Sequence, residues 1–219
     1  MSTLKALAAV LTYPEPALLE VLPEIRGILS SDQRLGRDDR VRLAALIDEL
    51  SAADPLDTQE RYVELFDRGR ATSLHLFEHV HGEARDRGQA MVDLNALYAR
   101  HGLVIASNEL PDYLPAVLEY LSLRPLEEAR DMLGDCAHVL RAVGGALVGH
   151  DSPYSAVFGA LLTIAQEPAL DFQPKPRPAR VADAPALDEE WVDAPVMFGP
   201  GCADAKPKAQ VVRFMSKPT

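Results

Sequence analysis

The chain has 219 residues, of which 47% are hydrophobic, and its 33 acidic and 22 basic side chains give a formal net charge of −11. This hydrophobic content is ample for a core that folds by itself, and the acidic balance argues against a nucleic-acid partner, because phosphates attract basic surfaces. No apolar stretch approaches the roughly twenty residues that cross a bilayer, so we expect a soluble, cytoplasmic protein without membrane insertion.

Apolar residues recur at helical spacing along most of the chain, and no run alternates as a strand would. In chain order we predict helices at about 3–12, 16–29, 38–52, 57–67, 73–80, 85–100, 112–123, 126–147 and 153–166. The most regular apolar stripe lies in 126–147 and predicts one buried helix. Short polar connections indicate antiparallel neighbours. The prediction is an all-α fold, a single helical-bundle domain of about eight to nine helices over residues 1–166.

The composition changes after residue 166, because nine of the seventeen prolines fall in the last 53 residues. This predicts a Pro-rich, largely irregular C-terminal tail over residues 167–219. The single tryptophan, Trp191, lies there within the short apolar stretch DEEWVDAPVMFGP. That stretch can dock on the protein itself or on a partner, so a scaffold that binds through its tail is one alternative function.

Three histidines gather in the stretch LHLFEHVHGEARDRG, residues 74–88. On a helix His75 and His79 share a face, and with His81 they are the basis of a second alternative, a metal-dependent enzyme. A catalytic zinc helix uses His-Glu-x-x-His, whereas here Glu78 directly precedes His79. The two cysteines are 66 residues apart, without Cys-x-x-Cys spacing. We therefore expect no catalytic site, no metal and no cofactor.

The stretch SNELPDYLPAVLEYL, residues 107–121, leads into an amphipathic helix. Glu109 and Asp112 would lie at the first turn, where the helix dipole favours carboxylates, and would stay ionised and partly exposed. Helix capping accounts for only one of these two acidic residues. Two acids beside Tyr113 can also bind a cation or a peptide backbone, and both interpretations remain open at this point.

Three segments in this order resemble a known family: YVELFD at 62–67, LHLFEHVHGEARDRGQAMVDL at 74–94 and ELPDYLP at 109–115. They are similar to the respiratory nitrate reductase molybdenum cofactor assembly chaperones of the NarJ type, also called the delta subunit. The resemblance covers about residues 1–166, and WVDAPVMFG in the tail is similar to the family's C-terminal segment. The wider redox-enzyme maturation chaperones have a Glu-Pro-x-Asp-His type motif, which residues 109–113 match loosely, with Tyr113 in the His place.

The resemblance implies an all-helical, cytoplasmic, non-catalytic chaperone. It would bind the N-terminal segment of the catalytic (alpha) subunit of respiratory nitrate reductase. It would keep that subunit competent for molybdenum cofactor insertion and complex assembly, and the cofactor insertion machinery is a further partner that we expect.

For the mechanism, we predict a groove between helices that takes a partner peptide as a short amphipathic helix, with acids on its rim meeting Lys or Arg. The expected site residues are Glu109, Pro111, Asp112, Tyr113 and Leu114, with a wall of Tyr62, Phe66, Phe77, His79 and His81. The alternative for the three wall aromatics is ordinary core, and for the two histidines it is the ordering of a turn. We expect a Glu109→Ala, Asp112→Ala double variant to weaken peptide binding without unfolding the protein.

Overall fold

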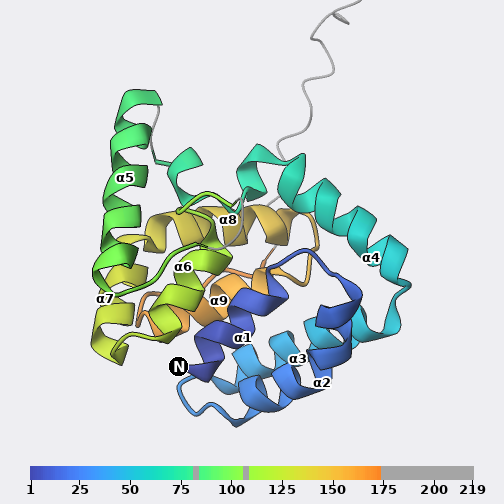
Figure 1. Ribbon diagram of the computed structural model, residues 1–219. Helices are drawn as coiled ribbons and strands as arrows, with labels where there is room; N and C mark the ends of the chain where they lie inside the picture. The colour runs from blue at the N-terminus through green and yellow to red at the C-terminus, as the bar shows by residue number, and fades with distance from the viewer. Residues whose placement is uncertain (81–83, 106–108, 174–219) are drawn as a thin grey trace, which may run out of the picture. The chain divides into compact units, whose positions relative to one another are not determined.

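The computed structural model describes residues 1–80, 84–105 and 109–173, with only the backbone of residues 84–86. Over these residues the fold is all-α and contains nine α-helices and no strand (Figure 1), which confirms the predicted fold class. The helices are α1 (Ser2–Val10), α2 (Pro16–Ser31), α3 (Arg37–Ala52), α4 (Pro55–Tyr62), α5 (Ala84–Arg100), α6 (Leu114–Ser122), α7 (Leu126–Asp135), α8 (Ala137–Gly149) and α9 (Ser155–Ile164). Among the described helices, none has the length and hydropathy to span a bilayer.

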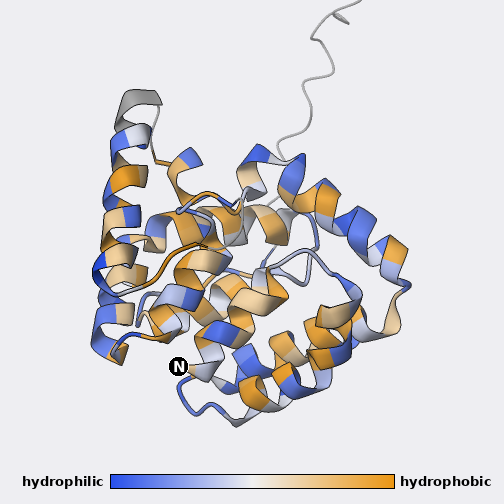
Figure 2. Ribbon diagram, viewed as in Figure 1, coloured by the Kyte–Doolittle hydropathy of each residue, from blue (hydrophilic) through white to orange (hydrophobic). Residues whose placement is uncertain are grey.

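The core is organised around α9, which is apolar on every side and therefore has to be buried all round. Its Val157, Phe158 and Leu161 are at most 1% exposed. Helices α3, α7 and α8 pack against α9, while α1 packs against α6 and α2 against α3. In Figure 2, hydrophobic and hydrophilic bands alternate along α2 and α3, as expected for helices with one buried face.

The segment after α9 packs against the helices before it leaves the described region. Leu170 is buried, and a Cβ atom at Gly144 would come within 2.9 Å of Leu170 Cδ2. The glycine at position 144 therefore lets the segment that follows α9 approach α8 closely. Phe172 lies under the guanidinium of Arg42, 4.0 Å from the ring centroid. The domain boundary at residue 166 stays a prediction, and the tail from residue 174, including Trp191, lies outside the described residues.

The prediction of one helix over 126–147 is wrong, although most of its apolar stripe is buried. Ala129, Leu133, Leu140 and Leu147 are all buried as predicted. The helix is interrupted at Cys136, where ψ is 1°, far from the helical value. Since α7 and α8 both pack against α9, the interruption lets each helix direct its own part of the stripe towards that core.

The predicted helix at 73–80 is also wrong. Only Leu76–Glu78 form a short 3₁₀ turn, called η3 here, and His75 pairs with Tyr113 in an isolated antiparallel bridge. Upstream of it, α4 continues into a π-helical turn, η1 (Val63–Asp67), and a 3₁₀ turn, η2 (Arg70–Thr72). Wide turns of the π type are rare and are often found at functional sites.

Candidate partner-binding site

Residues 74–76 and 112–114 run side by side and bring the two predicted site segments together. The Leu76 N–H donates to the Asp112 carbonyl at 3.1 Å, and the Leu114 N–H donates to the Leu74 carbonyl at 2.8 Å. On the α5 side, the buried hydroxyl of Tyr98 donates to the Pro111 carbonyl at 2.9 Å. These backbone contacts fix the start of α6 beside η3 and leave Pro111 and Leu114 buried beneath the surface.

Asp112 is completely buried, so the prediction of a partly exposed carboxylate at a helix mouth is wrong for this residue. Helix α6 begins only at Leu114. The Asp112 Oδ2 atom accepts a hydrogen bond from the Phe77 N–H at 3.0 Å, and Oδ1 lies 3.3 Å from His75 Nδ1. A buried carboxylate requires such partners. Asp112 therefore organises the turn at 75–77 and is not accessible to another protein.

The Asp112 carboxylate raises the pKa of His75, mainly through their hydrogen bond, which outweighs the opposing effect of partial burial. Because the pKa of His75 is higher in the folded state than in the unfolded state, its interaction with Asp112 stabilises the fold fully below about pH 6.5, the pKa of an unfolded histidine. This stabilisation is lost as the pH rises through the pKa of His75 in the folded state. We expect the stability difference between the wild type and a His75→Gln variant to shrink over that range above pH 6.5. Urea unfolding across pH 5.5–9 measures it. The same measurement on His138→Gln, at an exposed position on α8, shows what the loss of a histidine without this buried carboxylate partner does.

Tyr62 connects the end of α1 with the start of α6. Its hydroxyl donates to the Leu11 carbonyl at 2.8 Å and lies 3.2 Å from the Tyr113 hydroxyl. Its ring packs against Phe66, with centroids 4.8 Å apart, and edge-on to Tyr13 at 5.6 Å. Tyr62 and Phe66 are core residues by burial, yet both also line a surface depression.

Two adjoining depressions form what we call the groove. The larger, of about 560 Å³, lies between α1, α2 and α6, and the smaller, of about 180 Å³, lies beside η1. They share the lining residues Tyr13, Glu109 and Tyr113 and therefore lie next to each other. The residues lining the groove are Lys5, Ala8, Ala9, Thr12, Tyr13, Glu15, Ala17, Leu18, Tyr62, Phe66, Asp67, Leu74, His75, Glu109, Tyr113, Pro115, Ala116 and Glu119.

The lining of the groove is acidic. It carries four carboxylates, those of Glu15, Asp67, Glu109 and Glu119, against the single ammonium of Lys5, a formal charge of −3 before any protonation of His75. Alanines such as those at positions 8, 9 and 116 leave room between the helices. A concave surface with small residues and acidic side chains suits a basic amphipathic helix.

The structure thus brings together only some of the predicted site residues. Glu109, Tyr113, Tyr62 and Phe66 line the groove, whereas Phe77 is half-buried and packs against the core. His79 places Nε2 2.9 Å from the Ser73 carbonyl and so orders its own turn. His81 lies outside the described residues.

Sequence reasoning missed Tyr13, Glu15, Glu119 and the groove alanines. Tyr13 is 41% exposed and lies three residues after the end of α1. An aromatic residue next to Pro14, where a helix must end, was the available signal. An alanine on a helix looks like any other helix former, so nothing marked Ala116.

His75 and His79 do not share a helical face, although the metal alternative requires that they do. His75 and His79 lie on either side of η3, and a ring nitrogen of each faces a protein oxygen. Within the described ranges, no three His, Cys, Asp or Glu side chains are grouped so that they can hold a metal ion.

Comparison with known proteins gives the same family along most of the chain. A family model described as nitrate reductase delta subunit matches residues 32–160. The nitrate reductase molybdenum cofactor assembly chaperone NarJ of Escherichia coli (strain K12) is 42% identical, over 98% of this chain and 93% of its own length. The probable assembly chaperone NarW of the same strain is 44% identical over 75% of this chain and 68% of its own length. The probable chaperone NarJ of Bacillus subtilis (strain 168) is 30% identical over 73% and 86%, respectively. The chain belongs to the nitrate reductase delta subunit family.

Proposed function

We propose that this protein is an assembly chaperone of a respiratory nitrate reductase. It binds the N-terminal segment of the catalytic subunit and keeps that subunit competent for molybdenum cofactor insertion. Two observations support the proposal: the relatives named above are molybdenum cofactor assembly chaperones, and the groove between α1, α2 and α6 has room and charge for a peptide. Within the structure, the groove is the observation that carries the peptide-binding part of the proposal. Action in the cytoplasm and contact with the cofactor insertion machinery stay predictions from the family.

The affinity of the groove comes from its apolar part. A partner helix that buries four large side chains gains roughly 8 kcal/mol in total, at about 2 kcal/mol each, and ordering the peptide cancels several of these. Further apolar contacts and the rim are therefore needed to reach micromolar or tighter dissociation constants. The small alanines allow a helix backbone to come close, which increases the number of such contacts.

The acidic rim contributes to the encounter and to orientation. Glu15, Glu109 and Glu119 lie at exposed positions around the larger depression, where they meet Lys or Arg side chains of an incoming peptide. Exposed ion pairs contribute about 0.2–1 kcal/mol each and weaken with salt. The rim therefore speeds association and orients the peptide, and it contributes less to the stability of the complex.

Calorimetric titration with a synthetic peptide of the catalytic subunit's N-terminal segment tests the proposal. We expect micromolar or tighter binding with a negative heat-capacity change, the mark of apolar burial. The triple variant Glu15→Gln, Glu109→Gln, Glu119→Gln should bind about tenfold more weakly at low salt, from roughly 0.5 kcal/mol per contact. The salt dependence of its affinity should also be largely lost.

The matched control removes three exposed carboxylates that do not line the groove, by Glu24→Gln, Glu60→Gln and Glu127→Gln. It reduces the net negative charge by the same three units and should keep most of the affinity. Equal losses in both triple variants would show that only the overall charge matters. Absence of binding by the wild type would reject the proposed function.

The alternative in which the Pro-rich tail holds the partner concerns residues 167–219, of which 174–219 lie outside the described residues. It stays a prediction of the sequence, and no observation of the structure favours it over the groove.

A further inference from the structure

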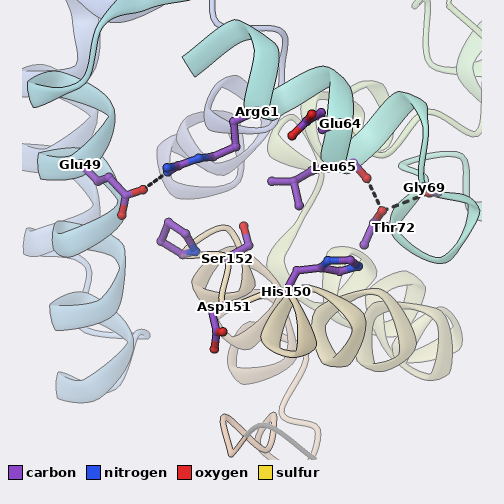
Figure 3. A pocket seen from close by; sticks show the side chains of 10 residues that line it. Glu49, Arg61, Glu64, Leu65, Gly69, Thr72, His150, Asp151 and Ser152 are labelled. Carbon is purple, nitrogen blue, oxygen red and sulfur yellow. Dashed lines mark hydrogen bonds and ion pairs between the residues drawn. The ribbon is translucent and has the colours of Figure 1, made fainter. Parts of the chain in front are cut away.

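A second cavity, of about 500 Å³, lies away from the groove, where α3, α4, η1 and η2 meet the turn between α8 and α9 (Figure 3). It shares no lining residue with the groove. Its lining residues are Glu49, Arg61, Glu64, Leu65, Gly69, Thr72, His150, Asp151, Ser152 and Pro153. Nothing in the proposed peptide site uses this cavity, so its composition calls for a separate explanation.

Ser152 is the least expected member of this lining. The residue is only 6% exposed, and its Oγ atom has no hydrogen-bond partner among the described residues. Figure 3 shows the hydroxyl directed into the cavity, towards the space below Arg61 and Leu65. A buried hydroxyl without a partner is costly, so an N–H group of a ligand at this position would satisfy it.

The charges around the cavity favour a cation. One nitrogen of the Arg61 guanidinium pairs with Glu49 (Figure 3), so these two charges largely balance each other. Glu64 is exposed, and its carboxylate has no ion-pair partner in the described part of the chain. The Asp151 side chain is directed away from the cavity in Figure 3. Among the described residues, the unpaired charges of this lining, those of Glu64 and Asp151, are both negative, and they would repel a phosphate or a carboxylate.

Leu65 and Pro153 supply the apolar part of the same lining. An apolar wall beside an unpaired carboxylate and an unpartnered hydroxyl matches a ligand with an alkyl stem and an N–H-rich cationic end. We propose that this cavity binds an alkylguanidinium or alkylammonium group, with its stem on Leu65 and Pro153 and its N–H groups on Glu64 and Ser152. The source is a Lys or Arg side chain of a bound polypeptide or a free small amine or guanidine.

Titration of the ¹⁵N-labelled full chain with ethylguanidinium chloride, followed by NMR, tests the site. We expect saturable shifts of the amides at 61–65 and 150–152, with a dissociation constant on the order of millimolar for so small a ligand. Ethylurea, which has a similar shape and N–H groups but no charge, should bind at least fivefold more weakly. Equal behaviour of the two compounds, or shifts that do not saturate, would overturn the proposal.

Two variants assign the contacts. Glu64→Gln and Ser152→Ala should each weaken ethylguanidinium binding at least fivefold, with thermal unfolding confirming that both remain folded. Glu60→Gln on the neighbouring turn, which removes an exposed carboxylate outside the cavity, should leave the binding unchanged. The same loss in Glu60→Gln as in Glu64→Gln would show that ethylguanidinium responds only to net charge, which overturns the assignment.

The catalytic-subunit peptide then distinguishes the sources. If the Glu64→Gln variant binds this peptide about fivefold more weakly, the cation is a side chain of that polypeptide. Unchanged peptide binding, with ethylguanidinium binding lost, supports a free small cation. Both results support the cavity as a cation site. Because the ethylguanidinium titration needs no peptide, the proposed function and this site can fail separately.

Discussion

Replacing Asp112 by alanine should lower the free energy of unfolding by about 2–4 kcal/mol. The reason is burial: the carboxylate is inaccessible to water, accepts the Phe77 N–H and lies beside His75 Nδ1. Removing it leaves a backbone donor and an imidazole without their partner, and each such loss costs about 1–3 kcal/mol. Urea unfolding monitored by circular dichroism measures the change.

Two further variants make this result specific. Asp112→Asn keeps one side-chain oxygen for the Phe77 N–H and should lose about half as much stability as Asp112→Ala. Glu109→Ala, at an exposed position three residues away, should stay within about 0.5 kcal/mol of wild type. Equal stability of Asp112→Ala and wild type would show that the carboxylate does not organise the 75–77 turn. The Glu109→Ala, Asp112→Ala double variant, expected from the sequence to lose peptide affinity without unfolding, should therefore lose stability as well, because Asp112 supports the fold.

Local periodicity was enough for most of the helices. In α6, Leu114, Val117, Leu118 and Leu121 recur at steps of three and four, and all are at most 2% exposed. Such a stripe predicts both the helix and the face it buries, since no distant residue has to be known. The same reasoning predicted a helix at about 153–166, where the structure has α9.

Long-range contacts decided the parts that the sequence did not predict. Leu74 and Phe77 have helical spacing, yet the segment pairs with residues 112–114, which lie more than 35 positions away. The interruption at Cys136 likewise depends on how α7 and α8 reach α9. Tertiary contacts of this kind outweigh local propensity, which is worth only a few tenths of a kcal/mol per residue.

For the same reason, the sequence predicted only one wall of the groove. Glu109 and Tyr113 are close together in sequence and flank Asp112, so their segment could be singled out. Its opposite wall comes from α1 and the start of α2, about a hundred residues earlier, through the packing of α1 on α6. The sequence contained the alanines and Tyr13 but gave no measure of their distance from α6.

Filling the groove should weaken partner binding more than removing its charges. Ala116 is half-buried on α6 and lines the larger depression. The indole of an Ala116→Trp variant would occupy space that we assign to one apolar side chain of the peptide. Losing that burial costs about 2 kcal/mol, or about thirtyfold in the dissociation constant. Calorimetric titration with the catalytic-subunit peptide measures the loss.

Stability and specificity have to be controlled in the same experiment. Because the groove opens to solvent, the added indole should change the free energy of unfolding by less than about 1 kcal/mol, in contrast to overpacking of a closed core. Ala99→Trp, at an exposed position on α5 outside the groove, introduces the same side chain and should leave the peptide affinity unchanged. If Ala116→Trp binds the peptide as tightly as wild type, the peptide lies elsewhere. Equal weakening in both variants would instead mean that an added indole interferes wherever it is placed, and the space between α1, α2 and α6 would no longer be the reason for binding.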